Sequence, residues 1–378
     1  MSRRTFADFF AGIGLARMGL EAAGWKPEFC NDIDPKKFEM YKANFGRRGY
    51  RVADIWDLRA SQIPDVDLWW ASFPCTDVSL AGYRKGLAGS QSGTLMAMLN
   101  LLREKDAQRP PLVVLENVSG FISSHRGEDF DEAIRELNGM GYVCDAFILD
   151  AIHFVPQSRP RLFIVGVRDQ VPTDDVLTAL TKRDRHLKMR QLTSFMTDKE
   201  DLDWVILNLP PPPPPDTRLA DFLERIGPSS KRWWPEERVQ YLLNQMFDRH
   251  RAVVEVLKSR PTLTYGTAYR RMRNNKSMAE LRADGTAGCL RTPKGGSSRQ
   301  ILVAVGRGTV RARFMTPREC ARLMGAPSYR IRVTDNQAYF GFGDAVCVPV
   351  VAWIAENVLN PLVGASAKEA REYAGAAI

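Results

Sequence analysis

Two polar side chains with reactive groups follow two apolar runs of the sequence. Cys75 comes directly after Pro74 and the run 66–73, and Glu116 with Asn117 closes a second run. Such runs are typical of buried strands, and open α/β sheets place their chemistry at the carboxyl ends of these strands. A thiol that adds to a ring carbon and a carboxyl that protonates the same ring form a working pair for methylating a pyrimidine.

A pair of arginines follows further along. Arg159 and Arg161 flank Pro160, and side chains spaced by one residue point the same way from an extended segment, which suits a phosphate and a base carbonyl. Each feature alone has an ordinary alternative. A Pro-Cys step is usually structural, Glu116 could cap a helix or lie on the surface, and the arginines could be a surface pair.

The first apolar run leads into a glycine turn, whose residues are Phe10, Ala11, Gly12, Ile13, Gly14 and Leu15. Two glycines one residue apart let a ligand approach the backbone at a helix N-terminus. The third glycine of the dinucleotide fingerprint is absent, because Arg17 occupies its place. The turn therefore favours a ligand without phosphates.

Carboxylates follow the next two extended segments. Asp32 with Ile33 stands at the distance usual for a ribose-binding acid, and Asp54 with Ile55 could receive an adenine amino group. Asp32 and the nearby Asp34 could instead be helix caps, and Asp54 a turn residue. Their order after the glycine turn indicates an adenosine-containing cofactor.

Composition points to a globular protein with a polyanionic partner. The 378 residues predict two domains, and 44% of them are hydrophobic and 26% charged. A net charge of +9 favours nucleic acid, although such an excess can also serve solubility. The six cysteines form no C-x-x-C pair, so we expect no metal site and a reduced, cytoplasmic compartment. No stretch is long enough for a signal sequence or a membrane span.

The first part of the chain alternates apolar runs with amphipathic stretches, which predicts a parallel sheet flanked by helices. We expect strands over 5–10, 27–30, 68–72, 112–115, 143–149 and 162–167, and helices over 15–23, 35–44 and 128–137. The pattern ends at Arg168. A proline run at 210–215 predicts a stiff spacer. A capped helix is expected over 316–324, and a tight turn over 341–344 before a final apolar helix.

Basic residues gather in two glycine-containing stretches. The stretch 76–94 holds Arg84 and Lys85 and could close over a polyanion. The stretch 269–313 is denser, and its glycines predict loops that contact phosphates. Its candidate DNA-binding residues are Arg270, Arg271, Arg273, Arg291, Lys294 and Arg299.

Taken together, these blocks resemble the C5-cytosine DNA methyltransferase family, in family order and over nearly the whole chain. The matching blocks are Phe10 to Gly14, Asn31 to Asp34, Asp54-Ile55, Phe73-Pro74-Cys75, Glu116-Asn117-Val118, Gln157 to Arg161, Thr316 to Gly325, Gln337-Ala338-Tyr339 and Phe342 to Val346. Three positions depart from the pattern. Leu15 replaces a frequent glycine, Thr76 a frequent glutamine, and Asp344 a frequent asparagine.

The resemblance implies a Rossmann-like α/β methyltransferase sheet that uses S-adenosylmethionine, with a smaller, irregular target-recognition domain. Residues 1–170 and 335–378 would form the catalytic domain, 171–315 the recognition domain, and 316–334 the helix and connection back. Leu95, Asp344, Ala345 and Val346 would join the cofactor site, and Ser79 the DNA-binding residues.

The implied reaction is methyl transfer to C5 of a cytosine flipped out of duplex DNA. Cys75 would attack C6, Glu116 would protonate N3, and Arg161 would bind the base carbonyl, with Arg159 in a supporting or phosphate role and Asn117 holding the Pro74-Cys75 loop. A monomer with a companion restriction endonuclease, acting at the nucleoid, is expected. The alternatives are a transfer RNA cytosine methyltransferase, a silent DNA-binding scaffold, and a nicotinamide-dependent dehydrogenase, which the missing glycine disfavours.

Overall fold

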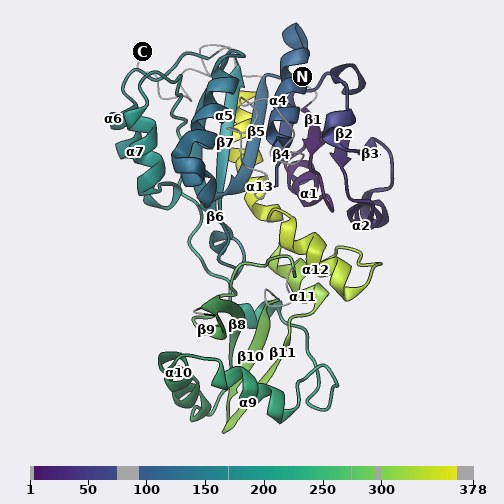
Figure 1. The fold of residues 1–378 in the computed structure, drawn as a ribbon, viewed down its shortest axis with the longest axis vertical. Coiled ribbons are helices and arrows are strands. Elements are labelled where there is room, and N and C mark those ends of the chain that lie inside the picture. The colour runs from purple at the N-terminus through teal and green to yellow at the C-terminus, as the bar shows by residue number, and fades with distance from the viewer. Residues whose placement is uncertain (1–3, 75–92, 169, 274, 294–298, 364–378) are drawn as a thin grey trace.

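The chain folds into two sheets, each with its own helices. The computed structural model describes residues 4–74, 93–168, 170–273, 275–293 and 299–363. Figure 1 shows the large sheet above the small one, with helices α11 and α12 between them. The strand order is β3-β2-β1-β4-β5-β7-β6 in the large sheet and β11-β10-β8-β9 in the small sheet.

The large sheet confirms the expected α/β fold. Strands β1 to β5 are parallel, and β7 is antiparallel to both of its neighbours, β5 and β6. Strand β5 continues beyond the expected end at residue 115, so Glu116 lies inside the strand and pairs in register with Ser72. The strands are β1 Thr5–Phe9, β2 Lys26–Asp32, β3 Tyr50–Val52, β4 Leu68–Ser72, β5 Leu112–Val118, β6 Tyr142–Asp150 and β7 Pro160–Arg168.

Successive strand residues pack into different cores on the two faces of this sheet, since strand side chains alternate in direction. Trp70 belongs to the core beside α1 (Leu15–Ala22) and α13 (Val348–Ile354). Trp69 belongs to the core beside α4 (Thr94–Glu104) and α5 (Glu128–Asn138). Helix α2 (Pro35–Phe45) packs beside β2. This double cover buries the strands and leaves their carboxyl ends for the site.

The segment 171–209 packs on the large sheet, although the sequence assigned it to the recognition domain. Helices α6 (Val176–Lys182) and α7 (Arg190–Asp198) bury apolar side chains in the core that contains α4 and α5. The Val205 backbone N–H also donates to the Cys144 carbonyl at 2.9 Å, which extends the sheet edge at β6. The core of the large sheet thus extends past the expected boundary at residue 171 towards the proline run, where His153 Nδ1 donates to the Pro213 carbonyl at 2.8 Å.

The small domain is a four-stranded antiparallel sheet covered on one face by α9 and α10. The expectation of loops in 269–313 holds for 283–293, which contains Gly285 and Gly288, but 269–273, 276–282, 301–306 and 309–313 belong to strands. Asn275 adopts a left-handed φ of 57°, which closes a hairpin between two strands whose side chains alternate. The elements are α8 Leu219–Phe222, α9 Glu236–Asn244, α10 Asp248–Lys258, β8 Thr264–Arg273, β9 Lys276–Arg282, β10 Ile301–Gly306 and β11 Thr309–Phe314.

The C-terminal helices return to the large sheet. Helix α11 (Pro317–Leu323) begins at the expected capping box of Thr316 and Glu319. The tight turn expected over 341–344 is wrong, because α12 (Asp335–Asp344) continues through it. Gly341 serves close packing instead, since a Cβ there would lie 2.8 Å from Ile13 Cγ2. The stretch Asp335–Leu362 is apolar enough to cross a bilayer, but 61% of its most apolar window is buried within the protein.

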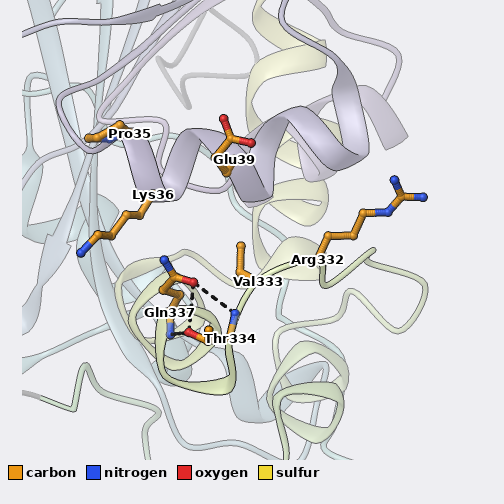
Figure 2. Close-up of a pocket in the computed structure, with 7 residues that line it drawn as sticks. All are labelled: Pro35, Lys36, Glu39, Arg332, Val333, Thr334 and Gln337. Carbon is orange, nitrogen blue, oxygen red and sulfur yellow. Dashed lines mark hydrogen bonds between the residues drawn. The ribbon is translucent and has the colours of Figure 1, made fainter.

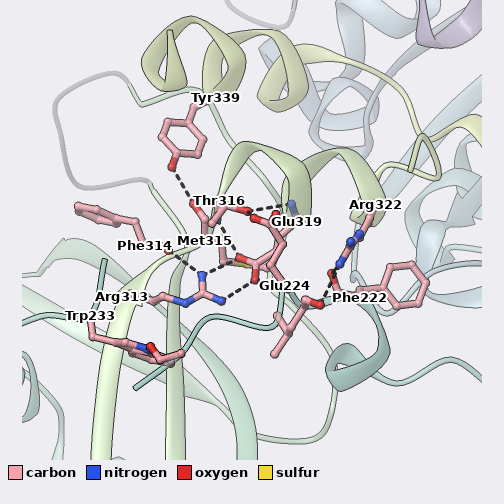
Figure 3. Close-up of polar contacts among 12 residues, drawn as sticks. Phe222, Glu224, Trp233, Arg313, Phe314, Met315, Thr316, Glu319, Arg322 and Tyr339 are labelled. Atoms are coloured by element: carbon pink, nitrogen blue, oxygen red, sulfur yellow. Dashed lines mark hydrogen bonds and ion pairs between the residues drawn. The ribbon is translucent and has the colours of Figure 1, made fainter. Parts of the chain in front are cut away.

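A buried ion pair ties the small sheet to α11. Arg313 donates to the Glu319 carboxylate from Nη1 at 2.7 Å and from Nη2 at 2.5 Å, and both side chains are almost fully buried (Figure 3). The Glu224 backbone N–H donates to the same carboxylate at 2.9 Å. Arg322 Nη1 donates to the Leu223 carbonyl at 2.8 Å, so two elements of the small domain are fixed against one helix.

Candidate active site at the carboxyl edge of the large sheet

The structure brings the expected acid and base-binding arginine together. Arg161 on β7 pairs in register with Val118 on β5, and its Nε lies 3.2 Å from Glu116 Oε1. Glu116 is 5% exposed, and this burial raises its pKa. Arg161 and Arg159 oppose the rise without cancelling it. The carboxyl therefore keeps its proton to a higher pH than an ordinary glutamate, as a general acid requires.

Asn117 holds the backbone that leads to the expected nucleophile. Its Nδ2 donates to the Phe73 carbonyl at 3.1 Å, immediately before the exposed Pro74. Its Oδ1 accepts from the Val118 backbone N–H at 2.8 Å, which fixes the amide orientation. Cys75 lies outside the described residues, as do Ser79, Arg84, Lys85 and Lys294. The described end of β4 nevertheless lies next to Glu116, because Ser72 pairs with it in register.

Arg159 is a clamp rather than a free cation. It is 2% exposed, and its fork joins two segments that are distant in sequence. Nη1 donates to the Leu290 carbonyl at 2.8 Å, and Nη2 donates to the carbonyls of Gly343 and Ala345 at 3.1 and 2.6 Å. These contacts favour the supporting role over the phosphate role. They also place Ala345, an expected cofactor residue, against the base-binding strand.

Cys289 belongs to this cluster although the sequence did not suggest it. Its Sγ lies 3.2 Å from Arg159 Nη1 and 3.9 Å from Arg161 Nη2. Burial alone would raise the pKa of this thiol, but the two guanidinium groups lower it below its ordinary value. No signal in the sequence could have found it, because the contact joins residues about 130 positions apart.

The glycine turn wraps around Asp32. Gly12 and Gly14 have φ of 54° and 83°, in the region that glycine tolerates, and Phe10 shares it at 57°. The Gly12 backbone N–H donates to Asp32 Oδ2 at 2.9 Å. Ile13 and Leu15 are 1% exposed and pack into the core, so a ligand meets the backbone of this turn rather than those two side chains. Ala11 is also buried.

The ends of β2 and β3 offer a polar and an apolar contact side by side. Asp54 caps a short helix by accepting from the Trp56 backbone N–H at 3.1 Å, a structural role other than the turn residue named as its alternative. Ile33 and Trp56 are 62% and 47% exposed, unusual for large apolar side chains. An adenine ring could pack between such groups. Ile55 and Leu95 are buried and support this edge from beneath.

Asp8 is a further candidate that the sequence analysis missed. It is fully buried on β1, and neither carboxylate oxygen has a hydrogen-bond partner among the described residues. Burial raises its pKa well above the ordinary value, and Asp32 adds to the rise. The signal in the sequence that could have pointed to Asp8 is its charge, because it stands inside the first apolar run. A buried acceptor without a partner suits a ligand that carries an ammonium group.

Asp344 is neutralised by a lysine. Lys37 Nζ lies 2.8 Å from Asp344 Oδ2, so α2 and the end of α12 are joined across the mouth of the glycine turn. Burial lowers the pKa of Lys37, but Asp32 and Asp344 outweigh it and raise the pKa above its usual value. The Lys37 Cδ would lie 3.9 Å from a Cβ on Gly12. Val346 is buried behind this pair.

An open pocket of about 790 Å³ lies beside this edge, between the start of α2 and the start of α12 (Figure 2). Lys36, Glu39, Arg332 and Gln337 are among the residues that line it. None of the expected cofactor residues lines it, so the pocket is a neighbour of the glycine turn rather than the cofactor site.

The structure separates the expected DNA-binding arginines. Arg271 and Arg273 each form an ion pair with Glu280, both with an N···O distance of 2.8 Å. Arg270, one position along β8, lies instead over the rings of Trp234 and Tyr241. Among the others, Arg291 is exposed, and Arg299 Nη2 donates to Asn336 Oδ1 at 2.6 Å.

The chain belongs to the C-5 cytosine-specific DNA methylase family, whose model matches residues 4–360. It is therefore an enzyme, a C5-cytosine methyltransferase of the type that modifies DNA. It is 27% identical over 362 residues to the Type II methyltransferase M.HhaI of Haemophilus parahaemolyticus, covering 94% of each chain. It is 30% identical over 371 residues to the Type II methyltransferase M.NlaX of Neisseria lactamica, covering 95% of this chain and 97% of that one.

Solved structures share the fold. The Dnmt2 methyltransferase of S. pombe matches with a TM-score of 0.62 at 20% identity, over 96% of this chain and all of that one. A DNMT2 variant of Spodoptera frugiperda matches with a TM-score of 0.64 at 17% identity, over 94% of this chain and 99% of that one. At this sequence identity, the structural similarity supports a shared fold and nothing further.

Proposed function

We propose that this protein methylates C5 of a cytosine within a specific duplex DNA sequence, using S-adenosylmethionine and a transient covalent bond from Cys75. The observation that carries the proposal is the Glu116–Arg161 pair at the end of β5, next to the strand that leads to Cys75. The names of the Type II relatives support modification of DNA, and we propose a companion endonuclease and action as a monomer at the nucleoid.

The cofactor site fits S-adenosylmethionine in three respects. Asp32 can receive the ribose hydroxyls, Ile33 and Trp56 can cover the adenine, and the glycine turn lacks the third glycine that a pyrophosphate prefers. Asp8 offers its unpartnered carboxyl to the amino group. When bound, the cofactor supplies an electrophilic methyl group at its sulfonium.

The protein residues prepare the cytosine to accept that methyl group. C5 is a poor nucleophile while the ring is aromatic. Addition of the Cys75 thiolate to C6, with a proton given to N3 by Glu116, turns C5 into a nucleophilic enamine carbon. Arg161 binds the base carbonyl oxygen. After methylation, loss of the C5 proton and expulsion of the Cys75 thiolate restore the ring, and N3 returns its proton to the Glu116 carboxylate.

The target base must leave the helix, because these atoms cannot be reached in a stacked duplex. Unstacking costs a few kcal/mol, and phosphate contacts from the small domain offset that cost. The expected residues for these contacts are Arg270, Arg271, Arg273, Arg291 and Arg299 with the undescribed Lys294, and for the basic loop Ser79, Arg84 and Lys85. Glu280 already neutralises two of these arginines, so we propose that they orient the β8–β9 hairpin as much as they bind phosphate.

The test compares methyl incorporation from labelled S-adenosylmethionine into duplex DNA and transfer RNA. We expect incorporation into DNA alone and none with Cys75→Ser, which should still bind duplex DNA. Bisulfite sequencing of DNA from expressing cells would then report the target sequence. Incorporation into RNA in preference to DNA, or normal turnover by Cys75→Ser, contradicts the proposal.

A further inference from the structure

Arginines and aromatic rings alternate along one side of the small domain and continue to the large domain. We name this series the arginine ladder. Its members, in spatial order, are Tyr241, Arg270, Trp234, Arg238, Phe314, Arg299 and Tyr339. Each guanidinium lies over two rings, at distances from 4.0 Å for Arg238 on Trp234 to 5.8 Å for Arg270 on Tyr241.

Separate segments of the chain supply the ladder, so the sequence does not display it. Arg270 lies on β8, Arg238 and Tyr241 on α9, and Phe314 on β11. Arg299 precedes β10, and Tyr339 belongs to α12 of the large domain. Figure 3 shows the Phe314 and Tyr339 rings on the same side of the junction between the domains.

The positive charge of the ladder is not neutralised within the described residues. Arg238, Arg270 and Arg299 form no ion pair there, whereas their neighbours Arg271 and Arg273 share Glu280. The Nε atoms of Arg270 and Arg299 are buried without a hydrogen-bond partner. Burial lowers the pKa of Arg238, and the nearby charge of Arg270 lowers it further. Three cations without a carboxylate partner make this surface positive, which favours an anionic ligand.

We propose that the arginine ladder binds the phosphate backbone of the DNA duplex on one flank of the recognised bases. The inference rests on the proposed function and extends its contact surface beyond the expected residues to Arg238. A guanidinium that stacks on a ring is held in place and can still donate its N–H groups to phosphate oxygens. Arg299 already donates through Nη2 to Asn336, whereas the side chains of Arg238 and Arg270 make no hydrogen bond among the described residues. Such contacts position the duplex without reading its sequence.

Single-stranded nucleic acid is a poorer occupant of this surface. Unpaired bases bind by stacking on open aromatic faces. In the ladder, guanidinium groups already cover the rings of Trp234 and Phe314, each by two arginines. The arrangement therefore offers hydrogen-bond donors rather than stacking platforms.

Arg238→Gln tests the ladder, because Arg238 is exposed and makes no hydrogen bond or ion pair among the described residues. Arg249→Gln removes the same charge from an exposed position on α10 outside the ladder and is the matched control. Binding to duplexes of about one and about three helical turns would be measured against salt concentration. Arg270→Gln is the second variant.

For the long duplex we expect the slope of log K against log salt to fall by about 0.9 in Arg238→Gln, the loss of one phosphate contact. The short duplex should show no change, and Arg249→Gln should match the wild type on both. An unchanged slope in both ladder variants overturns the proposal, and so does a greater loss of affinity for single-stranded RNA than for duplex DNA. Failure of the wild type to methylate DNA would instead contradict the proposed function.

Discussion

At the scale of single residues, burial decides what the carboxyl groups of this site can do. Glu116 and Asp8 lie on neighbouring parts of one sheet, and burial raises the pKa of both. Glu116 lies beside Arg161 at the carboxyl edge of the sheet, which suits proton donation to a base bound there. Asp8 has no hydrogen-bond partner among the described residues, which suits a bound cation. We therefore propose that these two buried carboxyl groups serve different parts of the reaction, Glu116 at the base and Asp8 at the cofactor.

Glu116→Gln should slow methyl transfer by about 10²- to 10⁴-fold, because the amide cannot give a proton to N3. The raised pKa of Glu116 also predicts that the wild-type rate falls on the alkaline side, as the carboxyl loses its proton. Single-turnover rates across pH check both points. A rate within a few-fold of the wild type contradicts the acid role.

Asp8→Asn should flatten the pH dependence of stability. An aspartate in the unfolded chain loses its proton at a pH of about 4, the ordinary aspartate pKa. Asp8 in the folded protein keeps its proton to a higher pH, because burial raises its pKa. This stabilisation is complete below the pKa of the unfolded chain and declines as pH rises towards the folded-state pKa. Thermal unfolding at several pH values measures the effect. A variant with the wild-type pH profile contradicts it.

Asp344→Asn should weaken binding of S-adenosylmethionine more than binding of its demethylated product, S-adenosylhomocysteine. The change leaves the Lys37 cation without this partner beside the glycine turn, where it would repel a sulfonium but not a neutral thioether. We expect affinity for S-adenosylmethionine to fall about fivefold more than affinity for S-adenosylhomocysteine, about 1 kcal/mol. Calorimetric titration measures both. Lys37→Met added to Asp344→Asn should restore the ratio, and Lys42→Met is the control.

At the scale of elements, the parallel strands were predictable because each is an apolar run that ends in a polar cluster. The contact between Glu116 and Arg161 was not, since it depends on β7 entering antiparallel between β5 and β6. The small sheet was not predicted, because the glycines of the basic stretch indicated loops and the arginines hid the alternation of its strands. In β8, Arg271 and Arg273 point to one face of the sheet and Arg270 to the other, so both faces carry charge and no apolar alternation is visible in the sequence.

The junction between the domains depends on one buried pair. Arg313→Met leaves the Glu319 carboxylate buried without its cation and should cost about 3 to 5 kcal/mol of unfolding free energy. Replacing both residues by methionine should cost less. Arg318→Met, which removes a half-buried arginine of the same helix that has no ion pair among the described residues, should also cost less. Urea unfolding followed by tryptophan fluorescence would measure these values. A loss below about 1 kcal/mol in Arg313→Met contradicts the junction's role.

At the scale of the whole molecule, two sheets and a return of the chain bring the site together. Arg159 joins the start of β7 to the segment at Leu290 and to the end of α12, so one buried guanidinium connects three parts of the candidate site. The sequence predicted two domains and a polyanion partner from length and charge. It could not predict that segment 171–209 covers the large sheet, because that packing depends on the exposed edge of β6.

Trapping the enzyme on its substrate tests the central claim most directly. A duplex with 5-fluorocytosine at the target position cannot lose the group at C5, so the covalent bond to the protein should persist once S-adenosylmethionine is present. We predict an adduct that survives denaturation and that peptide mapping places on Cys75. The absence of an adduct, or one on Cys289 beside the same arginines, would contradict the account.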